Sequence, residues 1–144
     1  MATVQNLMAL GMASPLARRM GINPVITSAF GATAGVANPI AGNQYFLVIT
    51  ATNTGSGLLL PQVGGQVGPA TGAFLGDEFY IQNNLTASIA VYVANNAAGS
   101  AVTLYGNAIS AAGTTGVSVP TGQSILVKIA TISTYVYMKS VSSA

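Results

Sequence analysis

The chain has 144 residues, of which four are Lys or Arg and two are Asp or Glu. Charged residues therefore make up 4 % of the chain, against roughly 25 % in a typical globular domain. Cysteine and histidine are both absent, which excludes a disulfide framework and the usual zinc, haem and iron–sulfur ligands, so we expect no cofactor and no metal. Because soluble monomers usually carry charged surfaces, so little charge indicates that other protein covers much of this surface. The alternative interpretation is a secreted β-protein of low charge.

No apolar run reaches the roughly 20 residues that a membrane-spanning helix needs. The first residues, MATVQ, lack a basic stretch followed by an apolar core, so no secretory signal is visible. We therefore expect a protein that is made in the cytoplasm, is used without secretory export, and has no membrane partner. The length suits one compact domain that is preceded by shorter segments.

The sequence of residues 1–22 predicts a short N-terminal helical segment. Apolar residues recur at helical spacing in its first half, at Val4, Leu7 and Met8. Ser14 and Pro15 are typical of a helix start, and Gly21 is typical of a helix end. We expect two short helices joined near Gly11. A DNA-binding helix-turn-helix needs a third helix and several cations that contact phosphates. This segment has two cations and no sign of a third helix, so no nucleic-acid partner is predicted.

Residues 23–43 are rich in Gly, Ala and Pro and show no sustained period. We interpret them as an extended arm or linker that could add a short edge strand. Pro24 and Pro39 argue against a central strand, because proline cannot donate a hydrogen bond to a neighbouring strand.

Residues 44–144 predict the β-domain, an antiparallel β-sandwich or jelly roll of about eight strands. The stretch Glu78–Tyr105 reads as a meander of three consecutive strands, because apolar and polar residues alternate along each run. The predicted strands are residues 44–52, 57–61, 78–82, 88–94, 102–105, 116–119, 124–132 and 135–141.

The residues that usually carry catalysis are scarce. Asp77 and Glu78 are adjacent, so along a strand they point to opposite faces and do not converge on a substrate. We interpret Asp77 as a turn or strand-entry residue that follows Gly76. The serines have no histidine to activate them. The glycine-rich stretch 64–76 contains no lysine and does not match a phosphate-binding loop. We predict no enzyme and no small-molecule substrate.

Several sequence blocks together resemble small proteins encoded beside the major capsid protein of tailed phages. The blocks are TVQNLMALGMASPLARRMG, GLLLP, GDEFYIQNN, VYVANNAAGSAVTLYGNAI and VPTGQSILVKIATISTYVYMKS. These proteins are head decoration, or cement, proteins of the jelly-roll type. They often carry a tryptophan in the last strand, where this chain has Tyr135 and Tyr137.

The resemblance implies a non-enzymatic structural protein of a bacteriophage virion, bound to the outer capsid surface and cementing neighbouring capsid subunits. Its expected partners are the major capsid protein and further copies of itself, as a dimer or trimer. The alternative is a carbohydrate-binding jelly-roll module, such as a host-surface adhesin, in which tyrosines stack on sugars. The candidate contact residues for the capsid or the oligomer are Leu7, Met8, Leu10, Met12, Leu16, Arg18, Arg19, Met20, Tyr92 and Tyr105.

Two positions for the N-terminal helices stay open. Isolated helices shorter than about 12–15 residues rarely persist in water, so the apolar residues of this segment must pack on something. One partner is the chain's own sandwich, and the other is a neighbouring protein reached through the arm. The proline and glycine content of the arm favours the neighbour.

Overall fold

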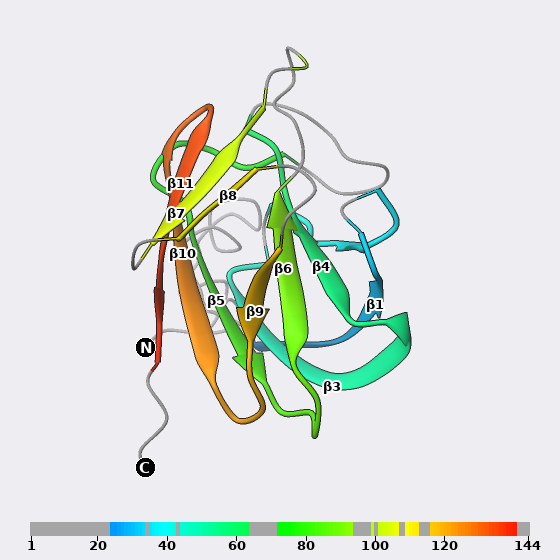
Figure 1. Ribbon diagram of the computed structural model, residues 1–144. Helices are drawn as coiled ribbons and strands as arrows, with labels where there is room; N and C mark the ends of the chain where they lie inside the picture. The colour runs from blue at the N-terminus through cyan, green and yellow to red at the C-terminus, as the bar shows by residue number, and fades with distance from the viewer. Residues whose placement is uncertain are drawn as a thin grey trace, which may run out of the picture.

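The computed structural model describes residues 24–33, 35–42, 44–63, 72–93, 99, 101–106, 109–112 and 116–140. Within these residues, eleven strands and no helix form one sheet of seven strands and one of four. The two sheets pack face to face as layers of a sandwich (Figure 1). The predicted all-β fold is confirmed, and the helical segment expected at residues 1–22 lies outside the described residues.

The strands follow two orders. The larger sheet consists of β1 (Pro24–Gly31), β3 (Phe46–Gly55), β5 (Glu78–Asn83), β10 (Ser124–Thr131), β11 (Thr134–Lys139), β7 (Thr103–Gly106) and β8 (Ile109–Ala112), in that order. The smaller sheet consists of β2 (Asn38–Pro39), β4 (Gly57–Leu60), β6 (Ile89–Val93) and β9 (Val117–Val119).

The first six strands alternate between the two sheets, so this half of the chain winds as a coil. In the larger sheet β1 pairs with β3 and β3 with β5, both parallel. In the smaller sheet β2 pairs with β4 and β4 with β6, again parallel. Parallel neighbours need a crossover connection, and here the intervening strand of the opposite sheet supplies it.

This topology corrects the prediction of an antiparallel sandwich or jelly roll. Both sheets are mixed, because antiparallel pairs join β5 to β10, β10 to β11, β7 to β8 and β6 to β9. The predicted meander is also wrong, since β5 and β7 lie in the larger sheet and β6 in the smaller one. Alternation of apolar and polar residues shows that one face of a strand is buried. It does not show to which of the two sheets the strand belongs, because strands of both sheets bury one face.

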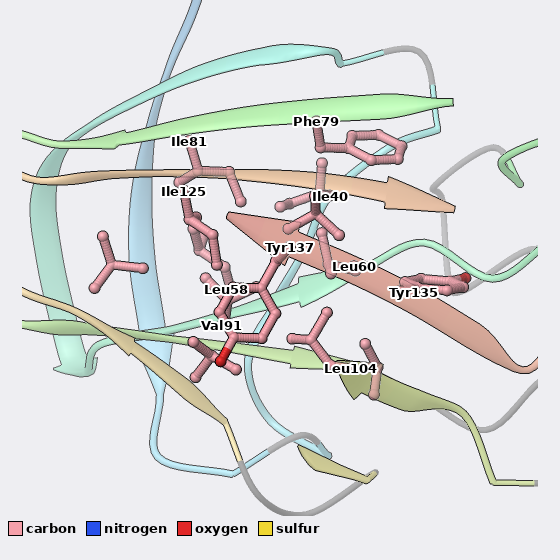
Figure 2. Packing of buried hydrophobic residues seen from close by; sticks show 14 of the residues in the cluster. Ile40, Leu58, Leu60, Phe79, Ile81, Val91, Leu104, Ile125, Tyr135 and Tyr137 are labelled. Atoms are coloured by element: carbon pink, nitrogen blue, oxygen red, sulfur yellow. The ribbon is translucent and has the colours of Figure 1, made fainter. Parts of the chain in front are cut away.

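The hydrophobic core lies between the sheets. Along β10, Ile125, Val127 and Ile129 are fully buried, while the residues between them face outward. Figure 2 shows side chains from both sheets, including Ile81 of β5 and Val91 of β6, directed into the same interior. The sequence predicted alternation of this kind within Glu78–Tyr105, and β5 shows it as well.

The arm expected at residues 23–43 contributes the first strand of each sheet. β1 and β2 stand at the ends of their sheets, where the missing donors of Pro24 and Pro39 cost no ladder hydrogen bond. β1 is therefore an edge strand, which the sequence had indicated as a possibility for the arm. It is eight residues long, and it pairs with β3 from Pro24↔Phe46 to Gly31↔Gly55.

A tight corner turns the coil from β1 towards the smaller sheet. Gly31 has a φ of 81°, and a Cβ atom there would lie 2.1 Å from the carbonyl oxygen of Val36. At the neighbouring corner a Cβ on Gly57 would lie 2.6 Å from the carbonyl oxygen of Gly31. Only glycine allows these backbones to approach so closely. Tyr92 closes the corner by donating a hydrogen bond from its hydroxyl to the carbonyl of Ala32, at 2.8 Å.

Asn83 joins the two sheets at the other end of β5. Its side chain is fully buried, and its Nδ2 donates to the carbonyls of Ala87 and Val119, both at 2.9 Å. Its Oδ1 accepts the backbone N–H of Leu85 at 3.0 Å. Because all three bonds are made, the buried amide stabilises the connection from β5 to β6 and ties it to the end of β9.

Candidate interaction surfaces

Three large apolar side chains project from two adjacent turns at one end of the sandwich. Phe74, Leu75 and Ile132 are 55 %, 59 % and 56 % exposed, respectively. Phe74 and Leu75 precede β5, and Ile132 lies between β10 and β11. The turns are neighbours because β5 and β10 pair with Glu78 opposite Lys128. We call these three residues the end patch.

The turn that carries Phe74 and Leu75 is held by its own backbone and by Asp77. The backbone N–H of Phe74 donates to Oδ2 of Asp77 at 2.9 Å, and the N–H of Asp77 donates to the carbonyl of Phe74 at 3.1 Å. Gly76, with a φ of 86°, supplies the left-handed residue that the turn needs. Asp77 is therefore a turn residue, as predicted, and it holds Leu75 at the exposed apex.

Ile132 is held outward by a short hairpin. Thr131 pairs with Thr134, so the loop consists of Ile132 and Ser133. The N–H of Ser133 donates to Oγ1 of Thr131 at 3.2 Å, and the carbonyl of Ser133 accepts the N–H of Thr103 at 2.9 Å. These bonds fix the loop to β7, which leaves the Ile132 side chain projecting from a rigid support.

A second apolar surface covers the outer face of the larger sheet, the face directed away from the smaller sheet. Registered pairs align Phe46 with Tyr80, Tyr80 with Leu126, and Leu126 with Met138 across four strands. We call these four residues the apolar row. The Phe46 and Tyr80 rings stack with centroids 5.0 Å apart, and Met138 is 65 % exposed. Cross-strand neighbours of this kind form one continuous strip.

An ion pair lies between the end patch and the apolar row. Nζ of Lys128 lies 3.0 Å from Oε1 of Glu78, and both side chains are about half exposed. A pair as exposed as this contributes little stability, about 0–1 kcal/mol. Next to it is a shallow depression of about 180 Å³ lined by Leu126, Val136, Tyr137 and Met138 as well as by the ion pair. Small-molecule pockets usually enclose about 300–1,000 Å³.

The structure separates the two tyrosines proposed as contact residues. Tyr105 of β7 is exposed and lies opposite Val136 on the outer face. Tyr92 is only 8 % exposed and packs with Ala37 and Leu59, so it is a packing residue of the coil corner and does not reach a partner. The remaining predicted contacts lie outside the described residues: Leu7, Met8, Leu10, Met12, Leu16, Arg18, Arg19 and Met20.

Two further tyrosines on β11 are buried. The Tyr135 hydroxyl donates to the carbonyl of Pro61 at 2.6 Å. Burial raises the pKa of Tyr135 to about 12, against a smaller lowering by a backbone hydrogen bond from Val63. Among the described residues the Tyr137 hydroxyl has no hydrogen-bond partner, although it too is buried. Neither ring is available for contact with another molecule.

Neither the end patch nor the apolar row was predicted from the sequence. The signal for the end patch was the pair Phe74–Leu75, two large apolar residues directly before the turn residues Gly76 and Asp77. The row had no such signal, because it exists only once β3, β5, β10 and β11 are aligned.

Within the described part of the chain, no group of three or more acidic, cysteine or histidine residues is placed to hold a metal ion. No helix among those residues is long and apolar enough to cross a membrane. Comparison with known proteins found no matching family model, no matching curated protein and no matching solved structure.

Proposed function

We propose that this protein is a non-enzymatic structural protein of a virion, which binds the outer capsid surface and cements neighbouring capsid subunits. The observation that carries the proposal is the end patch, because Phe74, Leu75 and Ile132 are each more than half exposed on hydrogen-bonded turns. Apolar side chains held outward in this way gain free energy when a partner covers them.

The mechanism is mass action. A protein that binds the assembled shell, and not its separated subunits, shifts the equilibrium towards the shell. The expected partner is the major capsid protein, with the protein located on the virion surface. Association of further copies into a dimer or trimer would place several end patches on adjacent subunits and raise the strength of attachment.

The carbohydrate-binding alternative receives less support. Stacking on sugars requires exposed aromatic faces, and all six tyrosines lie among the described residues. Tyr92, Tyr135 and Tyr137 are buried, Tyr45 and Tyr80 are partly buried, and Tyr105 alone is exposed. One exposed ring does not form a stacking platform.

The test is co-sedimentation with purified particles. We expect the wild-type protein to sediment with particles in a stoichiometric amount, and the double variant Phe74→Ser/Leu75→Ser to be retained at least tenfold less. Losing the burial of two such side chains costs about 3 kcal/mol or more, since each is worth about 1.5–3 kcal/mol.

Val36→Ser is the matched control, because Val36 is 59 % exposed but lies in the connection from β1 to β2. It should leave retention unchanged. Absence of the wild-type protein from particles contradicts the proposed function. Equal retention of the double variant and the control would show that the end patch is not the attachment surface.

A further inference from the structure

The apolar row ends at the point where the described chain begins. Pro24 pairs with Phe46, the first member of the row, and the row continues through Tyr80 and Leu126 to Met138. Residues 1–23 therefore join the domain beside this strip. Ile26, two residues further along β1, is 73 % exposed and belongs to the same side of the sheet.

The segment that joins there is rich in apolar residues and contains no acidic residue. Residues 3–20 include Leu7, Leu10 and Leu16 together with Met8, Met12 and Met20. Methionine adapts its shape to uneven apolar surfaces. The sequence predicts two short helices here, and short helices need an apolar surface on which to pack.

We propose that residues 3–20 pack across the outer face of the larger sheet of their own chain and cover the apolar row. The dimensions agree. From β1, where the segment joins, to Met138 on β11 there are four inter-strand steps of about 4.8 Å, or about 19 Å. At about 1.5 Å per residue, the two helices expected within residues 3–20 would span up to about 27 Å if they lay end to end. Residues 21–23 would then be the connection, and their number is common between a helix and a strand, where about 2–6 residues are usual.

A segment of the same chain is favoured over a second copy by proximity. A connection of a few residues holds its two ends at an effective concentration in the millimolar range, well above the concentration of a second copy in dilute solution. The apolar character of both surfaces supplies the attraction. This arrangement does not extend to the end patch, since Phe74, Leu75 and Ile132 lie beyond the Glu78–Lys128 pair.

The absence of cysteine from the chain allows a direct test on the free, full-length protein. The variant Leu16→Cys/Met138→Cys carries one thiol in the segment and one at the end of the apolar row. The matched control is Leu16→Cys/Ser118→Cys, because Ser118 is exposed on β9 of the opposite sheet. Each is treated with a short thiol-to-thiol crosslinker and analysed by mass and by denaturing gel.

We expect the Met138→Cys variant to crosslink within one chain, at least tenfold faster than the control, at a rate independent of protein concentration. Crosslinking between two chains would show that a second copy's segment covers the face, and would overturn the proposal. Equal rates for the two variants would overturn it as well, since the segment would then have no preferred face.

A second readout does not depend on introduced thiols. If the segment covers Met138, peroxide should oxidise this residue several-fold more slowly in the wild-type chain than in the full-length variant Leu7→Asp/Leu16→Asp, as measured by peptide mass spectrometry. The same oxidation rate in both proteins would overturn the proposal. No particles are used, so these results are separate from the test of the proposed function.

Discussion

Two tyrosines on β11 have hydroxyl groups in opposite situations. The hydroxyl of Tyr135 donates to Pro61 at the end of β4 and so links the two sheets. The hydroxyl of Tyr137 is buried and has no partner among the described residues. A buried hydroxyl without a hydrogen bond loses its interaction with water and gains nothing in return.

Replacing each tyrosine by phenylalanine should therefore have different effects. Tyr135→Phe removes a hydrogen bond and leaves a buried carbonyl without its donor, so the free energy of unfolding should fall by about 1–2 kcal/mol. Tyr137→Phe should leave it unchanged or raise it by up to about 1 kcal/mol. Urea unfolding of both variants measures the difference. A loss for Tyr137→Phe as large as that for Tyr135→Phe would show that the Tyr137 hydroxyl has a partner.

At the scale of elements, the corner after β1 decides whether the coil can form. Gly31 combines a positive φ of 81° with a carbonyl oxygen only 2.1 Å from the position of a Cβ atom. Gly35 lies a few residues further along the same connection, and a Cβ atom there would meet nothing within 4 Å. The two glycines form a matched pair in which only one is required by geometry.

We expect Gly31→Ala to lower the free energy of unfolding by about 2 kcal/mol or more, because the backbone must shift and an unfavourable φ must be kept. Gly35→Ala should change it by less than about 0.5 kcal/mol. Thermal or urea unfolding provides the measurement. Similar stability of the two variants would contradict the conclusion that a side chain at residue 31 meets the backbone of Val36.

The sequence predicted the strands better than their arrangement. Each of the eight predicted runs contains a strand, from β3 to β11 with the exception of β8, because alternation along one run is a local property. β1 was predicted only as a possible edge strand in an arm, since its Gly, Ala and Pro content hides its pairing with β3. The parallel pairing, the end patch and the apolar row were not predicted, because they depend on which distant strands become neighbours.

At the scale of the whole molecule, the shortage of charge has a consequence for attachment. The described residues contain one exposed ion pair, Glu78–Lys128, and the end patch is apolar. If the protein binds a capsid by burying apolar surface, salt should have little effect on binding, because screening acts on charges.

We therefore expect retention on particles to change less than about twofold as the Debye length falls from about 10 Å in 0.1 M salt to about 3 Å in 1 M salt. Sedimentation across this range is the measurement, with a particle-bound protein of known salt sensitivity as the control. Release of the protein by moderate salt would instead show that cationic side chains carry the attachment. Arg18 and Arg19, which are adjacent in the sequence, would then be the first candidates.

The place of β10 in the larger sheet also governs when this protein can fold during synthesis. β10 lies between β5 and β11, and β11 connects onward to β7 and β8. Until residues 124–139 have left the ribosome, β1, β3 and β5 have no link within the sheet to β7 and β8. Each group then presents an unpaired edge, and β10 and β11, which unite the two groups, are synthesised after all the other described strands. The larger sheet can therefore close only after residues 124–139 have left the ribosome.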